Sequence, residues 1–169
     1  MYTNDVTGWM RPVELDWLYT QARRMSSIVE LGSFRGKSTV AFLDGCRGTV
    51  YAVDLFDDEH FGLYPDNTKS ENSMMHDFLK NTGNAPNLKV IKTYTVLAAC
   101  MVPSVDMVFI DSSHEYLQTL AELQAWNPKA LKLICGHDYM HGAAEVKRAV
   151  DGFFGFEPAR VQDIWYVEK

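Results

Sequence analysis

Short β-branched runs alternate with helix-period stretches along almost the whole chain, and this alternation constrains the fold most. Strands are predicted at 27–31, 49–56, 88–92, 105–111 and 131–136, with two short strands around Gln162-Asp163. Helices are predicted at 11–25, 37–46, 74–83, 112–126 and 143–154, with a short helix or turn at 95–101. Right-handed crossovers between such strands predict an α/β fold. We expect a Rossmann-like, doubly wound, mostly parallel sheet with helices on both faces and an antiparallel strand at the C-terminus.

The helix expected at 112–126 carries a local signature of its own. Ser112 stands three residues before Glu115, which is the capping-box pattern of a helix start. Leu117, Leu120 and Ala121 are predicted to form its buried stripe.

Size and charge limit the class of protein. The chain has 169 residues and is 47% hydrophobic, which suits one domain, residues 1–169, with a real core. Its net charge of −6 and scattered basic residues argue against nucleic-acid binding. Three cysteines without a C-x-x-C pair, no signal-peptide pattern and no apolar run near the ~18 residues of a membrane span predict a cytoplasmic protein.

In a doubly wound sheet, ligands bind outside the carboxyl ends of the strands, where the strand order reverses. This rule directs attention to the polar residues that follow each predicted strand. They are Glu30 to Gly36, Asp54, Thr93 to Thr95, Asp111, and Gly136 to Asp138.

The first of these strand ends is a glycine turn. Gly32 allows a sharp turn, and Gly36 allows a ligand or strand to approach the following helix closely. The helix N-terminus near Ser38 favours an anion. The spacing is not G-x-G-x-x-G, and Leu31 stands where a P-loop needs glycine, so a nucleotide triphosphatase is excluded. A tight structural turn remains an alternative.

Asp54 ends the second strand, one crossover after the glycine turn. This is close to the ~20-residue spacing of the acid that holds a ribose. A carboxylate there can accept from both ribose hydroxyls. The alternative is a helix or turn cap.

Four segments together resemble class I S-adenosylmethionine-dependent methyltransferases. They are the stretch from Trp9 to Phe42 with E-L-G-S-x-x-G-x-S-T, then "VYAVDLF", "VDMVFIDSSHEY" and "GHDYMHGAAEVKRAVDGFF". Within that class they resemble the small-molecule or sugar O-methyltransferase branch of macrocin type. The resemblance spans roughly residues 9–154 and implies S-adenosylmethionine as cofactor.

The resemblance implies a role for each matching position. The first motif would wrap the methionine part of the cofactor, Asp54 would hold the ribose, and Thr93-Tyr94-Thr95 would border adenine. The segment Thr93-Tyr94-Thr95 stands where the family usually has Gly-Asp-Ser. The predicted cofactor-binding residues are Glu30, Gly32, Ser33, Gly36, Ser38, Asp54, Tyr94, Thr95 and Asp111.

Three histidines near the last strand ends, His114, His137 and His141, are the predicted catalytic residues. Histidine titrates near neutral pH and suits the removal of a proton from an acceptor hydroxyl. Alternatively, Asp111, His137 and Asp138 would hold a divalent cation. Family members often place three acids there for magnesium, which a histidine suits poorly, whereas manganese, iron or zinc would tolerate it.

The predicted function is methylation of a hydroxyl on a small molecule or sugar. The alternative is an S-adenosylmethionine-binding module without catalysis that acts with a partner protein. An NAD-dependent oxidoreductase lacks its glycine spacing. The expected partner is a small-molecule acceptor, with no nucleic acid and no membrane, and a homo-oligomer is left open. The segment 55–75, with His60, Phe61 and Tyr64, is predicted either to cover the acceptor site as a lid or to be a surface loop.

Overall fold

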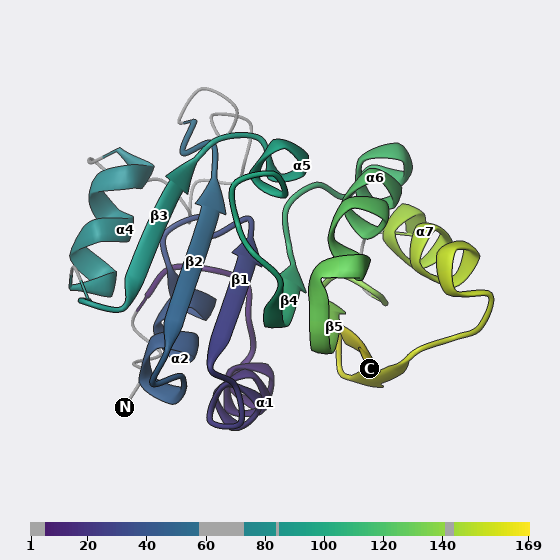
Figure 1. Ribbon diagram of the computed structural model, residues 1–169, viewed down its shortest axis with the longest axis horizontal. Helices are drawn as coiled ribbons and strands as arrows, with labels where there is room; N and C mark the ends of the chain where they lie inside the picture. The colour runs from purple at the N-terminus through teal and green to yellow at the C-terminus, as the bar shows by residue number, and fades with distance from the viewer. Residues whose placement is uncertain (1–5, 58–72, 84, 141–143) are drawn as a thin grey trace.

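The computed structural model describes residues 6–57, 73–83, 85–140 and 144–169 (Figure 1). In this part of the chain seven strands form one sheet in the order β3-β2-β1-β4-β5-β7-β6. The strands are β1 Ser27–Leu31, β2 Thr49–Asp54, β3 Leu88–Lys92, β4 Val105–Ile110, β5 Ala130–Gly136, β6 Ala159–Val161 and β7 Ile164–Glu168. The helices are α1 Pro12–Ala22, α2 Lys37–Gly45, α4 Met74–Thr82, α5 Thr95–Ala98, α6 Tyr116–Trp126 and α7 Ala144–Phe154, with a 3-10 turn η2 at Asn127–Lys129.

The predicted fold class is confirmed. Strands β1 to β5 pair in parallel, whereas β7 runs antiparallel to both β5 and β6. Gln162, with a φ of +55°, and Asp163 form the two-residue turn between Val161 and Ile164, which pair with each other. A turn this short joins only antiparallel strands, so β7 follows β6 without a crossover and lies between β6 and β5.

Helices cover both faces of the sheet, because buried strand residues alternate between two cores. One face packs Ile28 and Val50 against α1 and α2, with Ala52 against α4. The other packs Val29 and Val108 against α5, α6 and α7. None of the helices in the described ranges is long and apolar enough to cross a membrane.

Helix α6 departs from its predicted start and stripe. It begins at Tyr116 with Glu115 as its N-cap, and the Ser112 hydroxyl donates to Glu122 Oε1 at 2.5 Å. Leu117 is 76% exposed, so its place in the buried stripe was wrong. The buried residues are Thr119, Glu122, Leu123 and Trp126. A buried polar network, not the apolar spacing alone, sets the rotation of this helix.

The strand order reverses between β1 and β4, since β2 and β3 lie on one side of β1 while β4 and β5 continue on the other. The parallel register brings the carboxyl ends of these strands to one edge of the sheet. This is the edge where ligands bind in such folds. Residues 58–72 of the predicted lid, with His60, Phe61 and Tyr64, lie outside the described residues.

Candidate active site

The glycine turn joins the ends of β1 and β4 directly. Gly32 has a φ of +86°, and a Cβ there would lie 2.1 Å from the backbone oxygen of Asp111. The Asp111 amide in turn donates to the Leu31 carbonyl at 2.8 Å. Gly32 therefore serves a close approach between two strand ends, and it brings the glycine turn against the residues that follow β4.

Gly36 has a different neighbour from the ligand or strand that was expected. Its φ is +89°, and an added Cβ would lie 3.1 Å from Thr82 Cγ2 and 3.3 Å from the Phe78 ring, both on α4. In the described structure the glycine therefore makes room for a helix.

Glu30 is fully buried at the end of β1. Its two oxygens accept hydrogen bonds from Ser38 Oγ and Thr39 Oγ1, both at 2.5 Å, in the first turn of α2. Burial raises the pKa of Glu30 to about 7 in spite of these bonds. The buried Ser33 hydroxyl is near enough to help lower this pKa, yet it makes no regular hydrogen bond within the described ranges. A buried carboxylate beside an unsatisfied hydroxyl is a polar cradle that suits a cationic, hydrogen-bonding group.

Asp54 acts as a turn cap. Its Oδ2 accepts from the Phe34 amide at 2.8 Å and its Oδ1 from the Phe56 amide at 2.7 Å. Both phenylalanines have a φ of +47°, a conformation that these bonds hold in place. Each carboxylate oxygen keeps a further lone pair. The cap and the predicted ribose contact are therefore compatible.

Tyr94 and Thr95, the two predicted cofactor-binding residues of the segment expected to border adenine, lie in different surroundings. Tyr94 is 63% exposed and is the N-cap residue of α5. Thr95 is buried; its hydroxyl donates to Glu122 Oε1, and its carbonyl accepts from Trp126 Nε1 at 3.0 Å. Glu122 was missed from the sequence, where nothing separates it from an ordinary surface acid of a helix.

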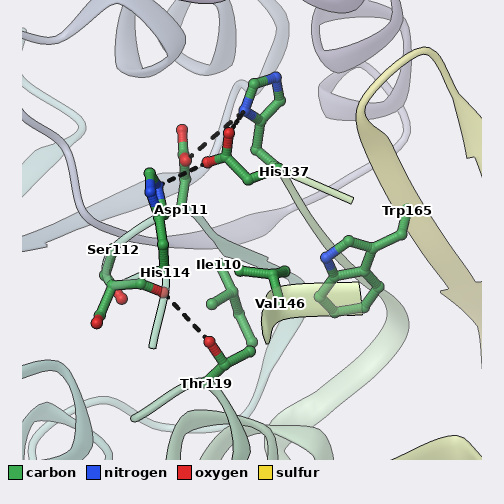
Figure 2. Close-up of a pocket in the computed structure, with 10 residues that line it drawn as sticks. Ile110, Asp111, Ser112, His114, Thr119, His137, Val146 and Trp165 are labelled. Carbon is green, nitrogen blue, oxygen red and sulfur yellow. Dashed lines mark hydrogen bonds and ion pairs between the residues drawn. The ribbon is translucent and has the colours of Figure 1, made fainter. Parts of the chain in front are cut away.

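Four side chains that follow β4 and β5 meet in one cluster, shown in part in Figure 2. His114 Nε2 lies 2.8 Å from Asp138 Oδ2, and the His114 side chain is 51% exposed. His137 is buried, with its Nδ1 3.4 Å from Asp138 Oδ1 and 3.9 Å from Asp111 Oδ1. Asp138 thus lies between the two imidazoles. His141 lies outside the described residues.

The charges of this cluster are set by burial and pairing. Burial opposes the charge on His137, but Asp138 and Glu14 outweigh it and raise the pKa of His137 to about 11. Burial would raise the pKa of Asp138, but His114 and His137 outweigh it and lower it. Burial raises the pKa of Asp111 to about 7. The hydrogen bond to Asp138 raises the pKa of His114.

Glu14, a residue that the sequence did not place in the site, reaches the other edge of His137. It lies on α1, and its Oε2 is 3.4 Å from His137 Nε2. Glu14 is fully buried. Its position three residues after Arg11 marks a helix start and gives no local sign of this contact.

A cavity of about 10 Å³, the size of one water molecule, opens beside the cluster. Asp111, His114 and His137 line its polar side, and Val146 and Trp165 line its apolar side (Figure 2).

The ligand atoms that the structure gathers for a cation differ from the predicted set. Asp111, His114 and Asp138 each place one ligand atom within 4.8 Å of the others. His137 has a carboxylate near each of its ring nitrogens and is held in the charged form, which does not coordinate metals. Two carboxylates and an imidazole would suit manganese, iron or zinc better than magnesium.

Comparisons with known proteins bear on the family and the fold of the chain. A family model described as "Methyltransferase domain" matches residues 29–139, which run from β1 to just past β5 and make up more than half of the chain. A search of curated proteins gives no match.

Solved structures share the fold at low sequence identity. Cofactor-bound Rv0187 from MTB aligns with a TM-score of 0.66 and 16% identity over 87% of this chain and 70% of that one. The O-methyltransferase from Bacillus cereus in complex with SAH aligns with a TM-score of 0.66 and 13% identity over 95% and 83%. A methyltransferase from Geobacter sulfurreducens aligns with a TM-score of 0.55 and 15% identity over 77% and 63%.

Proposed function

Because the chain belongs to the methyltransferase domain family, we propose that it uses S-adenosylmethionine to methylate a hydroxyl of a small molecule or sugar. The observation that carries this proposal is the contact between the turn predicted to bind the cofactor and the cluster predicted to bind the acceptor. The Gly32 turn, where the cofactor would lie, packs against Asp111, which opens the cluster that would receive the acceptor. The Bacillus cereus O-methyltransferase of similar fold is a complex with SAH.

The cofactor, when bound, supplies a methyl group on a cationic sulfur, which is already strongly electrophilic. The protein then has two tasks, namely to align the acceptor oxygen and to remove its proton. In this proposal Glu30, Ser33 and Ser38 hold the methionine part, and Asp54 holds the ribose.

His114 is the proposed general base. Asp138 Oδ2 lies 2.8 Å from His114 Nε2, and this contact favours the neutral tautomer of His114 that carries its proton on Nε2. The Nδ1 atom is then left as an acceptor for the hydroxyl proton. The His114 side chain is half-exposed and accessible to an acceptor. The His137 side chain, by contrast, is buried and held as an imidazolium.

The resemblance to macrocin-type enzymes supports a small polyhydroxylated acceptor. Residues 1–169 are proposed to form the single domain that binds it. The acidic balance of the chain supports neither nucleic acid nor an anionic membrane as a partner. A divalent cation at Asp111, His114 and Asp138 would replace the general base by lowering the pKa of the acceptor hydroxyl.

Binding and transfer are tested separately. We expect calorimetry to show binding of S-adenosylmethionine and S-adenosylhomocysteine but not of NAD. Radiolabelled methyl transfer to a panel of sugars, phenols and small alcohols then tests catalysis. Failure to bind S-adenosylhomocysteine would overturn the proposal. Binding without transfer to any compound would support the alternative of a cofactor-binding module that works with a partner protein.

A further inference from the structure

A continuous line of charged side chains runs from helix α1 to the exposed His114. Glu14 Oε2 lies 3.4 Å from His137 Nε2, and His137 Nδ1 lies 3.4 Å from Asp138 Oδ1. The second oxygen of Asp138 lies 2.8 Å from His114 Nε2. Glu14 therefore connects to the proposed base through two intervening side chains, although it precedes the span of the family match.

We infer that Glu14 is a positioning residue for methyl transfer, acting through His137 and Asp138 to orient the His114 ring. This inference rests on the proposed function, since it takes His114 as the base. It adds to the site a residue from an element that the strand-end rule does not include.

Glu14 is itself firmly held. Its Oε2 accepts from the Arg11 amide at 2.7 Å, and its Oε1 accepts from the Asp163 amide at 3.1 Å. One bond fixes the start of α1 and the other fixes the turn between β6 and β7. The carboxylate is thus tied to both ends of the described chain and provides a rigid reference for the imidazole beside it.

His137 needs such a reference on its inner edge. The residue is 8% exposed, and its Nε2 makes no regular hydrogen bond in the described ranges, so its contact with Glu14 is an ion pair. Without a charge on Glu14, only the contacts of Nδ1 with Asp138 and Asp111 hold the ring, and the pull on Nε2 that helps to set its orientation is lost. Asp138 pairs with both histidines, one through each oxygen. If His137 withdrew, the carboxylate would lose the contact that fixes its orientation, and it would hold the His114 ring less firmly.

The experiment detects which ring nitrogen of His114 carries the proton, by long-range ¹H–¹⁵N NMR at a pH where His114 is neutral. The native protein should show the proton on Nε2. In Glu14→Gln the preference for that tautomer should fall about tenfold, near the lower end of what a charge-assisted hydrogen bond such as that from His114 to Asp138 contributes. Asp106→Asn is the matched control. Its buried carboxylate accepts from the Ser26 amide and Lys132 at the opposite ends of the strands, so the variant loses stability but keeps the His114 tautomer.

His137→Gln tests the connection from Glu14 to His114 and leaves the bonds from the Arg11 and Asp163 amides to Glu14 in place. If Glu14→Gln fails to fold, this variant alone tests the inference. It should lower the tautomer preference by the same factor, and the double variant should be no worse than His137→Gln alone. An unchanged His114 in either single variant, or additive losses in the double, would overturn the inference. The affinity for S-adenosylhomocysteine should stay within about twofold in all of them. Failure of the proposed function would instead appear as absent binding or transfer in the native protein, whatever the ring tautomer.

Discussion

At the scale of single residues, the division of labour between two histidines follows from their surroundings. His137 is enclosed by carboxylates and stays charged, whereas His114 pairs with one carboxylate among the described residues and has an exposed edge. An imidazole can accept a proton only in its neutral form, so the more exposed histidine is the better base of the two.

His114→Ala should therefore lower the rate of methyl transfer by roughly 10² to 10⁴, the usual contribution of a general base. The affinity for S-adenosylhomocysteine should be retained, since the imidazole acts on the acceptor. The native rate should fall as the pH drops through the pKa of His114, which Asp138 raises. A variant that keeps the native rate and pH profile would exclude His114 as the base.

Asp54 offers a second test at this scale. Asp54→Ala should weaken binding of S-adenosylhomocysteine by about 1–3 kcal/mol in calorimetry, the range for charge-assisted hydrogen bonds. Asp54→Asn can still accept through its amide oxygen from one of the Phe34 and Phe56 amides, so it separates loss of the turn from loss of the ribose contact. Native affinity in a folded Asp54→Ala protein would remove the ribose from this position.

At the scale of elements, the ends of β1 and β4 depend on one glycine. Gly32→Ala should lower the free energy of unfolding by roughly 2–4 kcal/mol, because the methyl group would overlap the Asp111 carbonyl in a left-handed conformation. Gly83→Ala shares the positive φ but meets no atom of the described residues within 4 Å, so in chemical denaturation it should cost only about 1 kcal/mol. Equal losses in the two variants would contradict the close approach of the strands.

The link between β1 and α2 should make stability depend on pH. Glu30 has a pKa of about 7 in the folded protein against 4.5 for the ordinary group. Between these values the folded state keeps a proton that the unfolded state has released, so the free energy of unfolding falls as the pH rises from 4.5 to 7. The loss is on the order of 3 kcal/mol. Glu30→Gln should remove the contribution of this group to the pH dependence of the free energy of unfolding. If that free energy changed with pH in the same way in both proteins, Glu30 would not be the group responsible.

At the scale of the whole molecule, catalysis without a metal can be tested by chelation. Excess EDTA should cause at most a modest loss of methyl transfer, because His114 is proposed to take the proton directly. The control adds magnesium or manganese back after dialysis. Complete inactivation that manganese reverses would instead make Asp111, His114 and Asp138 metal ligands.

The sequence by itself determined the order of strands and helices, the mostly parallel sheet and the antiparallel end. These follow from residue periodicity and from the handedness of crossovers, which are local or general properties. It also identified the strand ends that hold Glu30, Asp54, Asp111 and His137, because parallel strands bring their carboxyl ends to one edge. The roles that it assigned to these residues remain predictions.

Only the tertiary structure decided which side chains meet. The bond from the Asp163 amide to Glu14 spans 149 residues, and no local pattern predicts it. The same holds for Glu122, which lies buried on α6 and accepts hydrogen bonds from Thr95 and Ser112. Buried polar groups must find partners wherever packing brings them. Their pairing, and with it the difference between His114 and His137, is therefore fixed by the folded arrangement and not by spacing along the chain.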